Sequence, residues 1–252
     1  MIEVSQLSKR YNGNHGIHDV SLTIGKGAIT SFIGPNGAGK STLLSVISRL
    51  LPMDEGTVRI GGMDVSKSDS RELAKVVSIL KQSNHLNVKL TVGELVEFGR
   101  FPHSAGRLNA EDRRQVDEAI RYMELEELRG KHLDNLSGGQ RQRAFIAMVL
   151  AQDTEYILLD EPLNNLDLKH SVQMMKVLRR LTDELGKTIV LVLHDINFAA
   201  AYSDSIVALK DGRVARHGAA DEMIDPAVLQ GIYDIDIPVY ELGGRKVCVY
   251  FR

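Results

Sequence analysis

Nine consecutive residues have the types and spacing of a phosphate-binding loop, and they are Gly34, Pro35, Asn36, Gly37, Ala38, Gly39, Lys40, Ser41 and Thr42. Glycines let the backbone wrap so that several N–H groups point at one phosphate chain, and the helix that follows adds the positive end of its dipole. We expect Lys40 to reach the β- and γ-phosphates of a nucleotide and the Ser41 hydroxyl to hold Mg²⁺. A purely structural glycine turn is the alternative, which the order of strand, loop and helix disfavours.

An acidic pair, Asp160 and Glu161, follows the apolar run Tyr-Ile-Leu-Leu at 156–159. A buried strand of this kind carries the pair to the carboxyl edge of an α/β sheet, where such sheets place their ligands. We expect Asp160 to orient Mg²⁺ and Glu161 to act as general base on an attacking water. A site that only binds a nucleotide needs the Asp160 carboxylate alone, so the presence of Glu161 favours hydrolysis. Taken alone, the motif could also be a helix N-cap or a turn.

A second segment with phosphate-binding chemistry consists of Leu136, Ser137, Gly138, Gly139 and Gln140. Ser137 and the amides of the two glycines would open a helix that runs to about residue 151, and the N-terminus of a helix attracts anions. The chain thus has two anion-binding helix starts and one phosphate-binding loop. The second start therefore needs a phosphate from another source.

The elements that must position these residues alternate between β-rich and helical runs, which predicts an α/β fold. Before the acidic pair we expect strands at 2–4, 20–24, 29–33, 57–60 and 76–80, with a helix at 43–51 closed by Pro52. From residue 92 to about 151 the pattern is helical and charged, which predicts an insert of about 60 residues. Beyond it we expect a strand at 156–159, a helix at 168–185 and a strand at 188–193. Continuous apolar strands suit a parallel sheet that is covered on both faces.

The last part of the chain shows a hairpin signal, Asp211-Gly212, between strands expected at 205–209 and 213–217. After it, residues 225–252 predict a short helix and two strands, to which we can assign no chemistry.

Composition limits the class of protein. The 252 residues include 31 Lys and Arg and 33 Asp and Glu, a net charge of −2, so the chain lacks the basic character of a nucleic-acid binder. A single cysteine, Cys248, excludes an internal disulfide and a thiolate-rich zinc site. The start of the chain has no apolar signal region, and the apolar runs at 144–151 and 189–193 are too short to cross a bilayer. We therefore expect a cytosolic chain that reaches a membrane only through a partner.

Over essentially its whole length, the chain resembles the ATPase subunits of ATP-binding-cassette (ABC) transporters. The further positions that carry the resemblance are Tyr11, Gln82, Asn164, Asn165, Leu166, Asp167 and His194. The resemblance implies an α/β fold of the P-loop NTPase class, with a mixed central sheet, an N-terminal antiparallel β subdomain and an inserted helical subdomain. It implies one ABC ATPase domain over 1–252, divided into a nucleotide-binding core at about 1–90 and 152–217, a helical signature subdomain at 91–151 and a C-terminal extension at 218–252.

The same resemblance implies roles for single residues. Tyr11 would stack on adenine, Gln82 would sense Mg²⁺ and the water, and His194 would contact the γ-phosphate and hold the water with Glu161. Ordinary packing is the alternative for Tyr11 and for His194.

Two subunits would form a homodimer around two ATP molecules. Each ATP would lie between the phosphate-binding loop of one subunit and, from the other, Ser137, Gly138, Gly139, Gln140 and Asp167. The pair Asn164-Asn165 departs from the small residues common in this loop, so the contact between subunits there is expected to differ in detail.

Two motifs, Glu97-Phe-Gly-Arg100-Phe-Pro-His103 and His194-Asp-Ile-Asn-Phe-Ala, are similar to those of importers for iron–siderophore complexes and cobalamin. This similarity implies iron–siderophore import through a transmembrane permease at the cytoplasmic face of the cell membrane, with a substrate-binding lipoprotein as indirect partner. We expect the segment from Gln82 to His103 to dock on that permease. Transport of cobalamin, haem or another metal chelate is an alternative, as are a non-transport ABC ATPase, another P-loop enzyme and a regulator without turnover.

Overall fold

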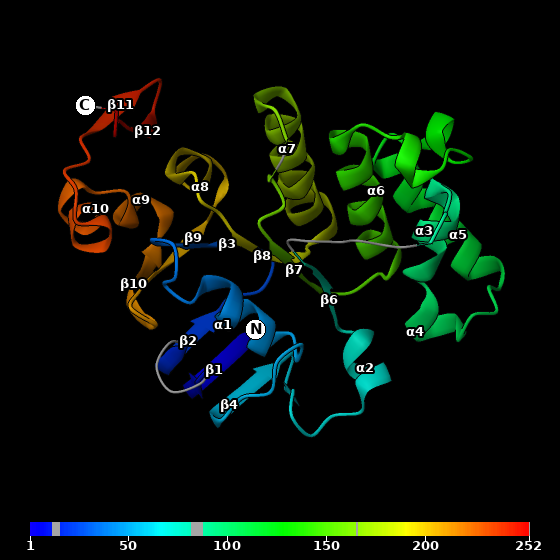
Figure 1. The fold of residues 1–252 in the computed structure, drawn as a ribbon, viewed down its shortest axis with the longest axis horizontal. Coiled ribbons are helices and arrows are strands. Elements are labelled where there is room, and N and C mark those ends of the chain that lie inside the picture. Colours follow the sequence, from blue (N-terminus) through cyan, green and yellow to red (C-terminus); the bar gives the residue numbers. More distant parts are fainter. Residues whose placement is uncertain (12–15, 82–87, 165, 252) are drawn as a thin grey trace.

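Residues 1–11, 16–81, 88–164 and 166–251 are described by the computed structural model (Figure 1). At their centre lies a sheet whose strands follow the order β10-β9-β3-β8-β7-β6, six among the described residues. Neighbouring strands from β9 to β6 run parallel and β10 runs antiparallel to β9, so the sheet is mixed. The strands are β3 (Ile29–Ile33), β6 (Val77–Leu80), β7 (Tyr156–Asp160), β8 (Thr188–Val192), β9 (Ser205–Lys210) and β10 (Arg213–Ala219).

The inner strands of this sheet are buried on both faces. In β7, Ile157 and Leu159 belong to one apolar core, whereas Tyr156 and Leu158 belong to the other. Successive side chains of a strand point to opposite faces, so each face needs its own apolar residues. This explains why the predicted strands read as unbroken apolar runs.

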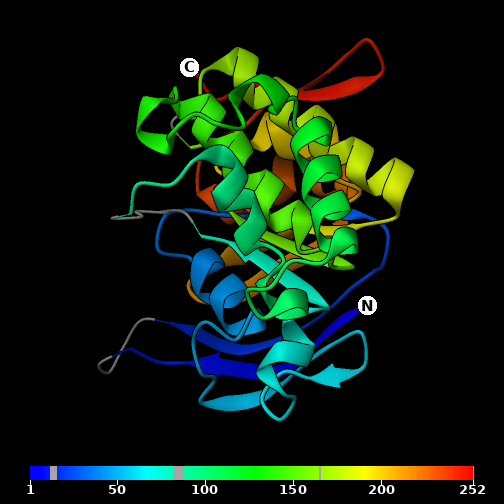
Figure 2. The same ribbon diagram turned by 90° about the vertical axis from the view of Figure 1, so that its right-hand side faces the viewer.

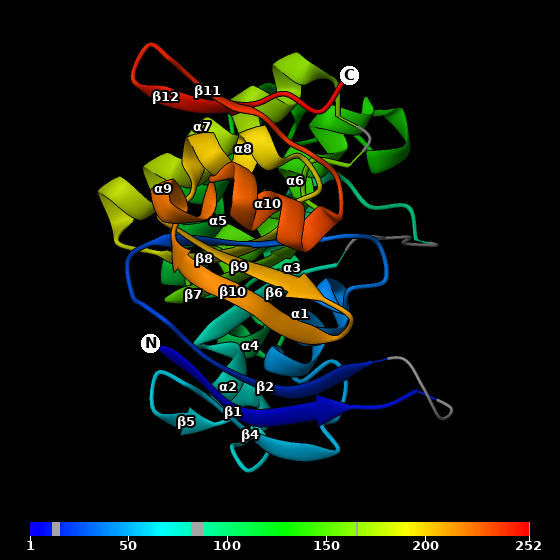
Figure 3. The same cartoon turned by 90° about the vertical axis from the view of Figure 1, so that its left-hand side faces the viewer.

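An antiparallel sheet of order β2-β1-β4-β5 lies below the central sheet in Figures 2 and 3. Helix α1 (Lys40–Ile47) lies between the two sheets, and its buried Leu43, Leu44 and Ile47 share one core with strands of both. The helix that follows the phosphate-binding loop is therefore held from two sides. The antiparallel strands are β1 (Ile2–Lys9), β2 (Ile17–Ile24), β4 (Glu55–Ile60) and β5 (Met63–Asp64).

Helices cover the opposite face of the central sheet (Figures 1 and 2). Three of their starts have capping boxes, in which Thr91, Asn109 and Ser137 exchange hydrogen bonds with the third residue of the helix. These helices are α3 (Val92–Phe98), α5 (Ala110–Tyr122), α6 (Gly138–Ala151), α7 (Leu168–Leu185) and α8 (Ile196–Tyr202), with short 3₁₀ helices at Glu126–Leu128 and Leu133–Asn135. The short helix α4 (Phe101–Ser104) follows α3 and has no buried residue.

The last part of the chain adds two helices and a hairpin beside β9, β10 and α8 (Figure 3). The Asn197 side chain of α8 accepts a hydrogen bond from the Cys248 N–H at 2.7 Å and donates one to its carbonyl at 3.1 Å, which fixes the hairpin to α8. The elements are α9 (Ala220–Met223), α10 (Pro226–Tyr233), β11 (Val239–Leu242) and β12 (Arg245–Cys248), while α2 (Ser70–Ala74) precedes β6.

Most of the predicted elements are confirmed, and β3 and α7 have the expected bounds. The turn between β9 and β10 has positive φ at Asp211 (50°) and Gly212 (75°), as a two-residue hairpin requires. The helix predicted at 43–51 is wrong at both ends. It begins at Lys40, because Gly39 with φ 98° ends the loop directly before it, and it ends at Ile47, after which Arg49 has φ 61°.

Candidate functional site: a nucleotide-binding edge of the central sheet

The phosphate-binding loop connects β3 to α1. Its first glycine, Gly34, has φ 137°, and a Cβ there would lie 2.0 Å from the carbonyl oxygen of Leu209 in β9. Its last glycine, Gly39, has φ 98°, and a Cβ there would lie 2.7 Å from Cγ2 of Ile17. Only glycine fits these two positions, so the loop runs pressed against β9 and β2.

Lys40 is buried at the first turn of α1, with 6% of its surface exposed. Its ammonium group donates hydrogen bonds to the carbonyl oxygens of Gly34 at 2.7 Å and Pro35 at 3.0 Å. Burial lowers the pKa of Lys40, and the nearby carboxylates of Glu161 and Asp160 oppose that shift. The loop thus holds a cation against its own backbone, at the place where the sequence predicts phosphate binding.

Ser41 and Asp160 meet across the gap between α1 and the end of β7. The Ser41 hydroxyl donates a hydrogen bond to Oδ1 of Asp160 at 2.8 Å. Burial raises the pKa of Asp160, and the hydrogen bond from Ser41 opposes this effect. A hydroxyl beside a carboxylate is a donor set of hard oxygen atoms, which fits Mg²⁺. Gln82, the third residue predicted to hold the ion, lies outside the described residues.

Glu161 and His194 contact each other at the carboxyl ends of β7 and β8. His194 Nε2 lies 2.7 Å from Oε1 of Glu161. Oε2 of the same carboxylate accepts a hydrogen bond from the side-chain amide of Asn164. Glu161 has a φ of 51°, an unusual backbone conformation for a residue with a Cβ that often marks a functional site. Each carboxylate oxygen of Glu161, the predicted general base, thus contacts one side chain, that of His194 or that of Asn164.

One cavity of about 300 Å³ joins these residues, and its lining comprises Gly16, Asn36, Gly37, Ala38, Gly39, Lys40, Ser41, Thr42, Glu161 and His194. The structure therefore brings together the loop and the two polar residues at the sheet edge, as the sequence predicts. Tyr11, which is 43% exposed, is not among the lining residues of this cavity. Its predicted contact with adenine stays a prediction.

Ser137, Gly138, Gly139 and Gln140 lie elsewhere, at the start of α6, and do not line that cavity. The Ser137 hydroxyl accepts a hydrogen bond from the Gln140 N–H at 3.3 Å. The same residues stand next to the start of α7, because a Cβ added at Gly139 would lie 3.0 Å from the ring of His170.

Asp167 caps helix α7 and binds His170. Its Oδ1 accepts the His170 N–H at 2.8 Å and lies 2.7 Å from Nδ1 of the same residue. These hydrogen bonds lower the pKa of Asp167. Asp167 and the start of α6 therefore meet at His170, which the sequence analysis did not single out, since a histidine three residues after an aspartate has no distinctive signal.

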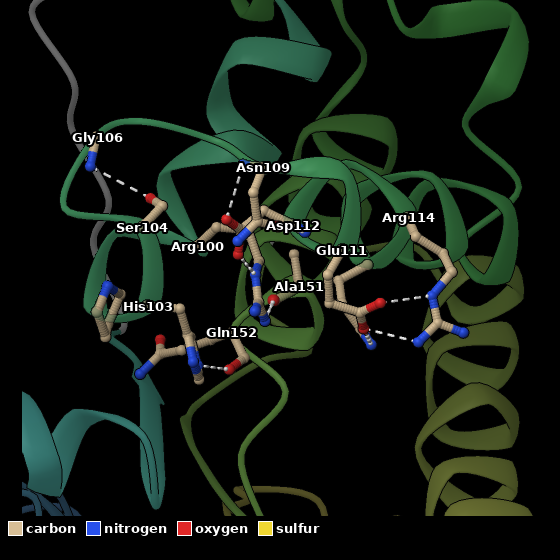
Figure 4. Close-up of polar contacts among 12 residues, drawn as sticks. Arg100, His103, Ser104, Gly106, Asn109, Glu111, Asp112, Arg114, Ala151 and Gln152 are labelled. Carbon is tan, nitrogen blue, oxygen red and sulfur yellow. Dashed lines mark hydrogen bonds and ion pairs between the residues drawn. The ribbon is translucent and has the colours of Figure 1, made fainter.

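Arg100 and His103 of the sequence motif join several helices of the insert (Figure 4). Arg100 Nε donates to Oδ1 of Asp112 at 3.0 Å, and its Nη1 donates to the carbonyl oxygen of Ala151 at 2.7 Å. The ring of His103 lies 2.9 Å from the carbonyl oxygen of Gln152. These contacts tie α4 to α5 and to the end of α6, which gives the motif a structural role.

A family model described as ABC transporter matches residues 17–164, which is more than half of the chain. The chain belongs to the ABC transporter family. This ABC ATPase is 59% identical over 251 residues to the petrobactin import ATP-binding protein YclP of Bacillus subtilis (strain 168), covering 100% of both chains. It is 51% identical over 250 residues to the petrobactin import ATP-binding protein FatE of Bacillus anthracis, covering 99% of this chain and 100% of FatE.

Solved structures agree with this assignment. The ABC ATPase matches the dimeric, post-hydrolysis structure of the ATP-binding cassette MJ0796 with ADP and Pi at 35% identity and a TM-score of 0.77, over 87% of this chain and 99% of that one. An inward-facing ABC transporter of the metal-chelate type matches in fold with a TM-score of 0.85 at 23% identity, over 99% of this chain and 98% of that one. The predicted α/β fold with a mixed sheet and an antiparallel N-terminal sheet is confirmed, and the chain is an ATPase of this family.

Within the described ranges, the ABC ATPase has no helix of the length and apolarity that a membrane crossing requires.

Proposed function

We propose that this ABC ATPase drives the import of an iron–siderophore complex through a transmembrane permease, with petrobactin as the first siderophore to test. The observation that supports this cargo is the 59% identity, over the whole of both chains, with an ATP-binding protein named for petrobactin import. Relatives named for a hydroxamate and for enterobactin are less similar, at 42% and 38% identity, and so are two others named for petrobactin import, at 41% and 36%. The names of these relatives refer to petrobactin, iron(3+)-hydroxamate and ferric enterobactin, so a siderophore is the common class of cargo.

The proposed reaction is the attack of water on the γ-phosphate of ATP in line with the leaving group. Glu161 takes the proton of the water, and His194, 2.7 Å from Glu161, orients that carboxylate. Lys40 supplies a positive charge to the β- and γ-phosphates. Ser41 and Asp160 would hold Mg²⁺, which when bound neutralises phosphate charge.

The proposed active form is a homodimer. The starts of α6 and α7, with Ser137 and Asp167, lie away from the cavity that contains Lys40. A second subunit can therefore supply these residues to the ATP that the first subunit holds. In that arrangement Gln140, Gly138 and Gly139 would contact the γ-phosphate from the other side.

The proposed permease contact includes the described residues from 88 to 103. Exposed apolar residues gather there, with Val88 62%, Phe98 56% and Phe101 61% exposed. Phe98 and Phe101 line a cavity of about 680 Å³ between α3, α4 and the start of α5. Apolar residues with a polar rim are typical of a protein interface. This contact would hold the ATPase at the cytoplasmic face of the membrane, below a permease supplied by a substrate-binding lipoprotein.

The variant Glu161→Gln tests the site. It should still bind ATP, lose at least about 100-fold of its turnover because the base is absent, and elute as a dimer when ATP is present. The control is Glu155→Gln, at the opposite end of β7, where Glu155 forms an exposed ion pair with Lys26. A Glu161→Gln variant that hydrolyses ATP normally, or that stays monomeric at high ATP, would contradict the proposed site.

The cargo is tested in cells that lack this chain and any second ATPase for siderophores. Uptake of radioactive iron bound to petrobactin should stop and should return with the wild-type chain, but not with Glu161→Gln. Normal uptake of every ferric siderophore in the deleted strain would refute the cargo and leave the ATPase assignment intact.

A further inference from the structure

The last helix of the chain reaches the first residue of the phosphate-binding loop. Tyr233 is the final residue of α10, and its hydroxyl oxygen accepts a hydrogen bond from the N–H of Gly34 at 3.1 Å. The two residues are 199 positions apart in the chain. The sequence alone assigned no chemistry to this C-terminal region.

Gly34 is the residue through which this contact can act on the site. Its N–H binds Tyr233, and its carbonyl oxygen accepts a hydrogen bond from the Lys40 ammonium group at 2.7 Å. The Cα of Gly34 also packs closely against β9, because a Cβ there would lie 2.0 Å from the carbonyl oxygen of Leu209. The position of Gly34 thus decides where the carbonyl that anchors Lys40 is placed.

Tyr233 is itself held firmly. The Lys210 ammonium group donates hydrogen bonds to the Gly231 carbonyl at 2.9 Å and to Asp234 at 2.7 Å, which fixes the end of α10 to the end of β9. Leu229 and Ile232 of the same helix are buried in the core that covers the central sheet. Burial raises the pKa of Tyr233 to about 12.

We propose that Tyr233 is a positioning residue of the nucleotide site, which holds the Gly34 peptide through its hydroxyl and thereby sets the place of the Lys40 ammonium group. The proposal rests on the proposed role of Lys40 in binding ATP. In this proposal the C-terminal helix α10 takes part in ATP binding, because its Tyr233 positions the first peptide of the phosphate-binding loop.

The test is the variant Tyr233→Phe, which removes the hydroxyl and keeps the ring that packs at the end of α10. A neutral hydrogen bond contributes about two- to tenfold to an equilibrium constant. We expect the KM for ATP to rise by about three- to tenfold and kcat to change by less than about twofold, because Lys40 contacts the phosphates both before and during the reaction. The control is Tyr240→Phe, which makes the same change on the exposed strand β11.

The outcomes distinguish the role of Tyr233 from the proposed site as a whole. A wild-type chain without ATPase activity would refute the proposed site. An active wild type whose KM equals that of Tyr233→Phe would refute the role of Tyr233 alone. A Tyr233→Phe variant with a lower melting temperature and a lower kcat at unchanged KM would show that the hydroxyl serves only the stability of the fold, and this would also overturn the proposal.

Discussion

At the level of single residues, Lys40 and Glu161 have different roles in the proposed site: Lys40 binds the phosphates and Glu161 is the general base. Lys40 is buried and is already bonded to two carbonyl oxygens of its own loop, so its charge lies at a fixed place. Glu161 is held by His194 and Asn164, one on each carboxylate oxygen. Fixed charges and fixed dipoles stabilise a reacting phosphate without reorganisation during the reaction.

The variant Lys40→Ala should lose tight binding of ATP. Hydrogen bonds to charged groups are worth about 1.5–3 kcal/mol, so the dissociation constant should rise by roughly 10- to 150-fold. The measurement is a titration of the purified chain with ATP and Mg²⁺. Lys67→Ala is the matched control, since the Lys67 side chain is 83% exposed and far from the loop in sequence. Equal affinities of the wild type and Lys40→Ala would rule out the predicted role of this lysine.

At the level of elements, the helical insert is held together by a buried ion pair. Arg100 and Asp112 are 6% and 2% exposed, and Arg100 also binds the last residue of α6, Ala151 (Figure 4). Close packing adds to this link, because a Cβ at Gly99 would lie 2.1 Å from the Met148 oxygen of α6. These contacts connect α4, α5 and the end of α6 within the insert.

Removing one partner of this ion pair should destabilise the chain strongly. Asp112→Ala leaves a buried guanidinium group without its carboxylate, and such a loss costs about 3–5 kcal/mol. Urea unfolding of the wild type and of Asp112→Ala at neutral pH measures the difference in their free energy of unfolding. The neighbouring pair of Glu111 and Arg114 lies in solvent, so Glu111→Ala should have a much smaller effect. Equal effects of the two substitutions would argue against the importance of burial.

The same pair predicts a dependence on pH. Burial by itself raises the pKa of Asp112, but the hydrogen bonds from the Asn109 N–H and from Arg100 outweigh it, so the pKa in the folded chain is lowered. A lowered pKa contributes stability above the unfolded value of about 3.9, and that stability is lost as the pH falls through the folded value. The gap in unfolding free energy between the wild type and Asp112→Asn should therefore shrink below about pH 4.

At the level of the whole molecule, the proposed ATPase site and the exposed apolar residues of α3 and α4 line different cavities. Figure 1 shows α3 and α4 to the right of α1 and β7, the elements that carry the site. Hydrolysis and permease binding should therefore be separable by substitution. The central sheet and the insert share one apolar core, which connects the proposed site to the proposed permease contact through packed side chains.

The double variant Val88→Ser with Phe101→Ser tests this separation. ATP hydrolysis by the isolated chain should stay within about twofold of the wild type, and iron–siderophore uptake in cells should fall by about tenfold or more, as expected for loss of a central interface residue. Leu242→Ser on β11, which removes a side chain that is 65% exposed, is the control. Normal uptake by the double variant would place the permease contact elsewhere.

The sequence by itself determined the fold class and most of the strands and helices, and it predicted which residues form the phosphate-binding loop and the acidic strand end. These signals are local. A loop of glycines before Lys40, an apolar run before Asp160 and the hairpin turn at Asp211 each act through a few neighbouring residues. The start of the helix predicted at 43–51 was wrong because the true start, Lys40, depends on the left-handed conformation of Gly39, next to the packed strand β2.

Only the tertiary structure decided which distant residues meet. Tyr233 reaches Gly34 across 199 positions, and His170 at the start of α7 meets Gly139 at the start of α6. The structural role of Arg100 also needed the fold, since its partners Asp112 and Ala151 come from two other helices. The local sequence around a single tyrosine, histidine or arginine does not predict which residue it will contact. Such contacts depend on the packing of whole elements around the central sheet, and sequence periodicity does not specify that packing.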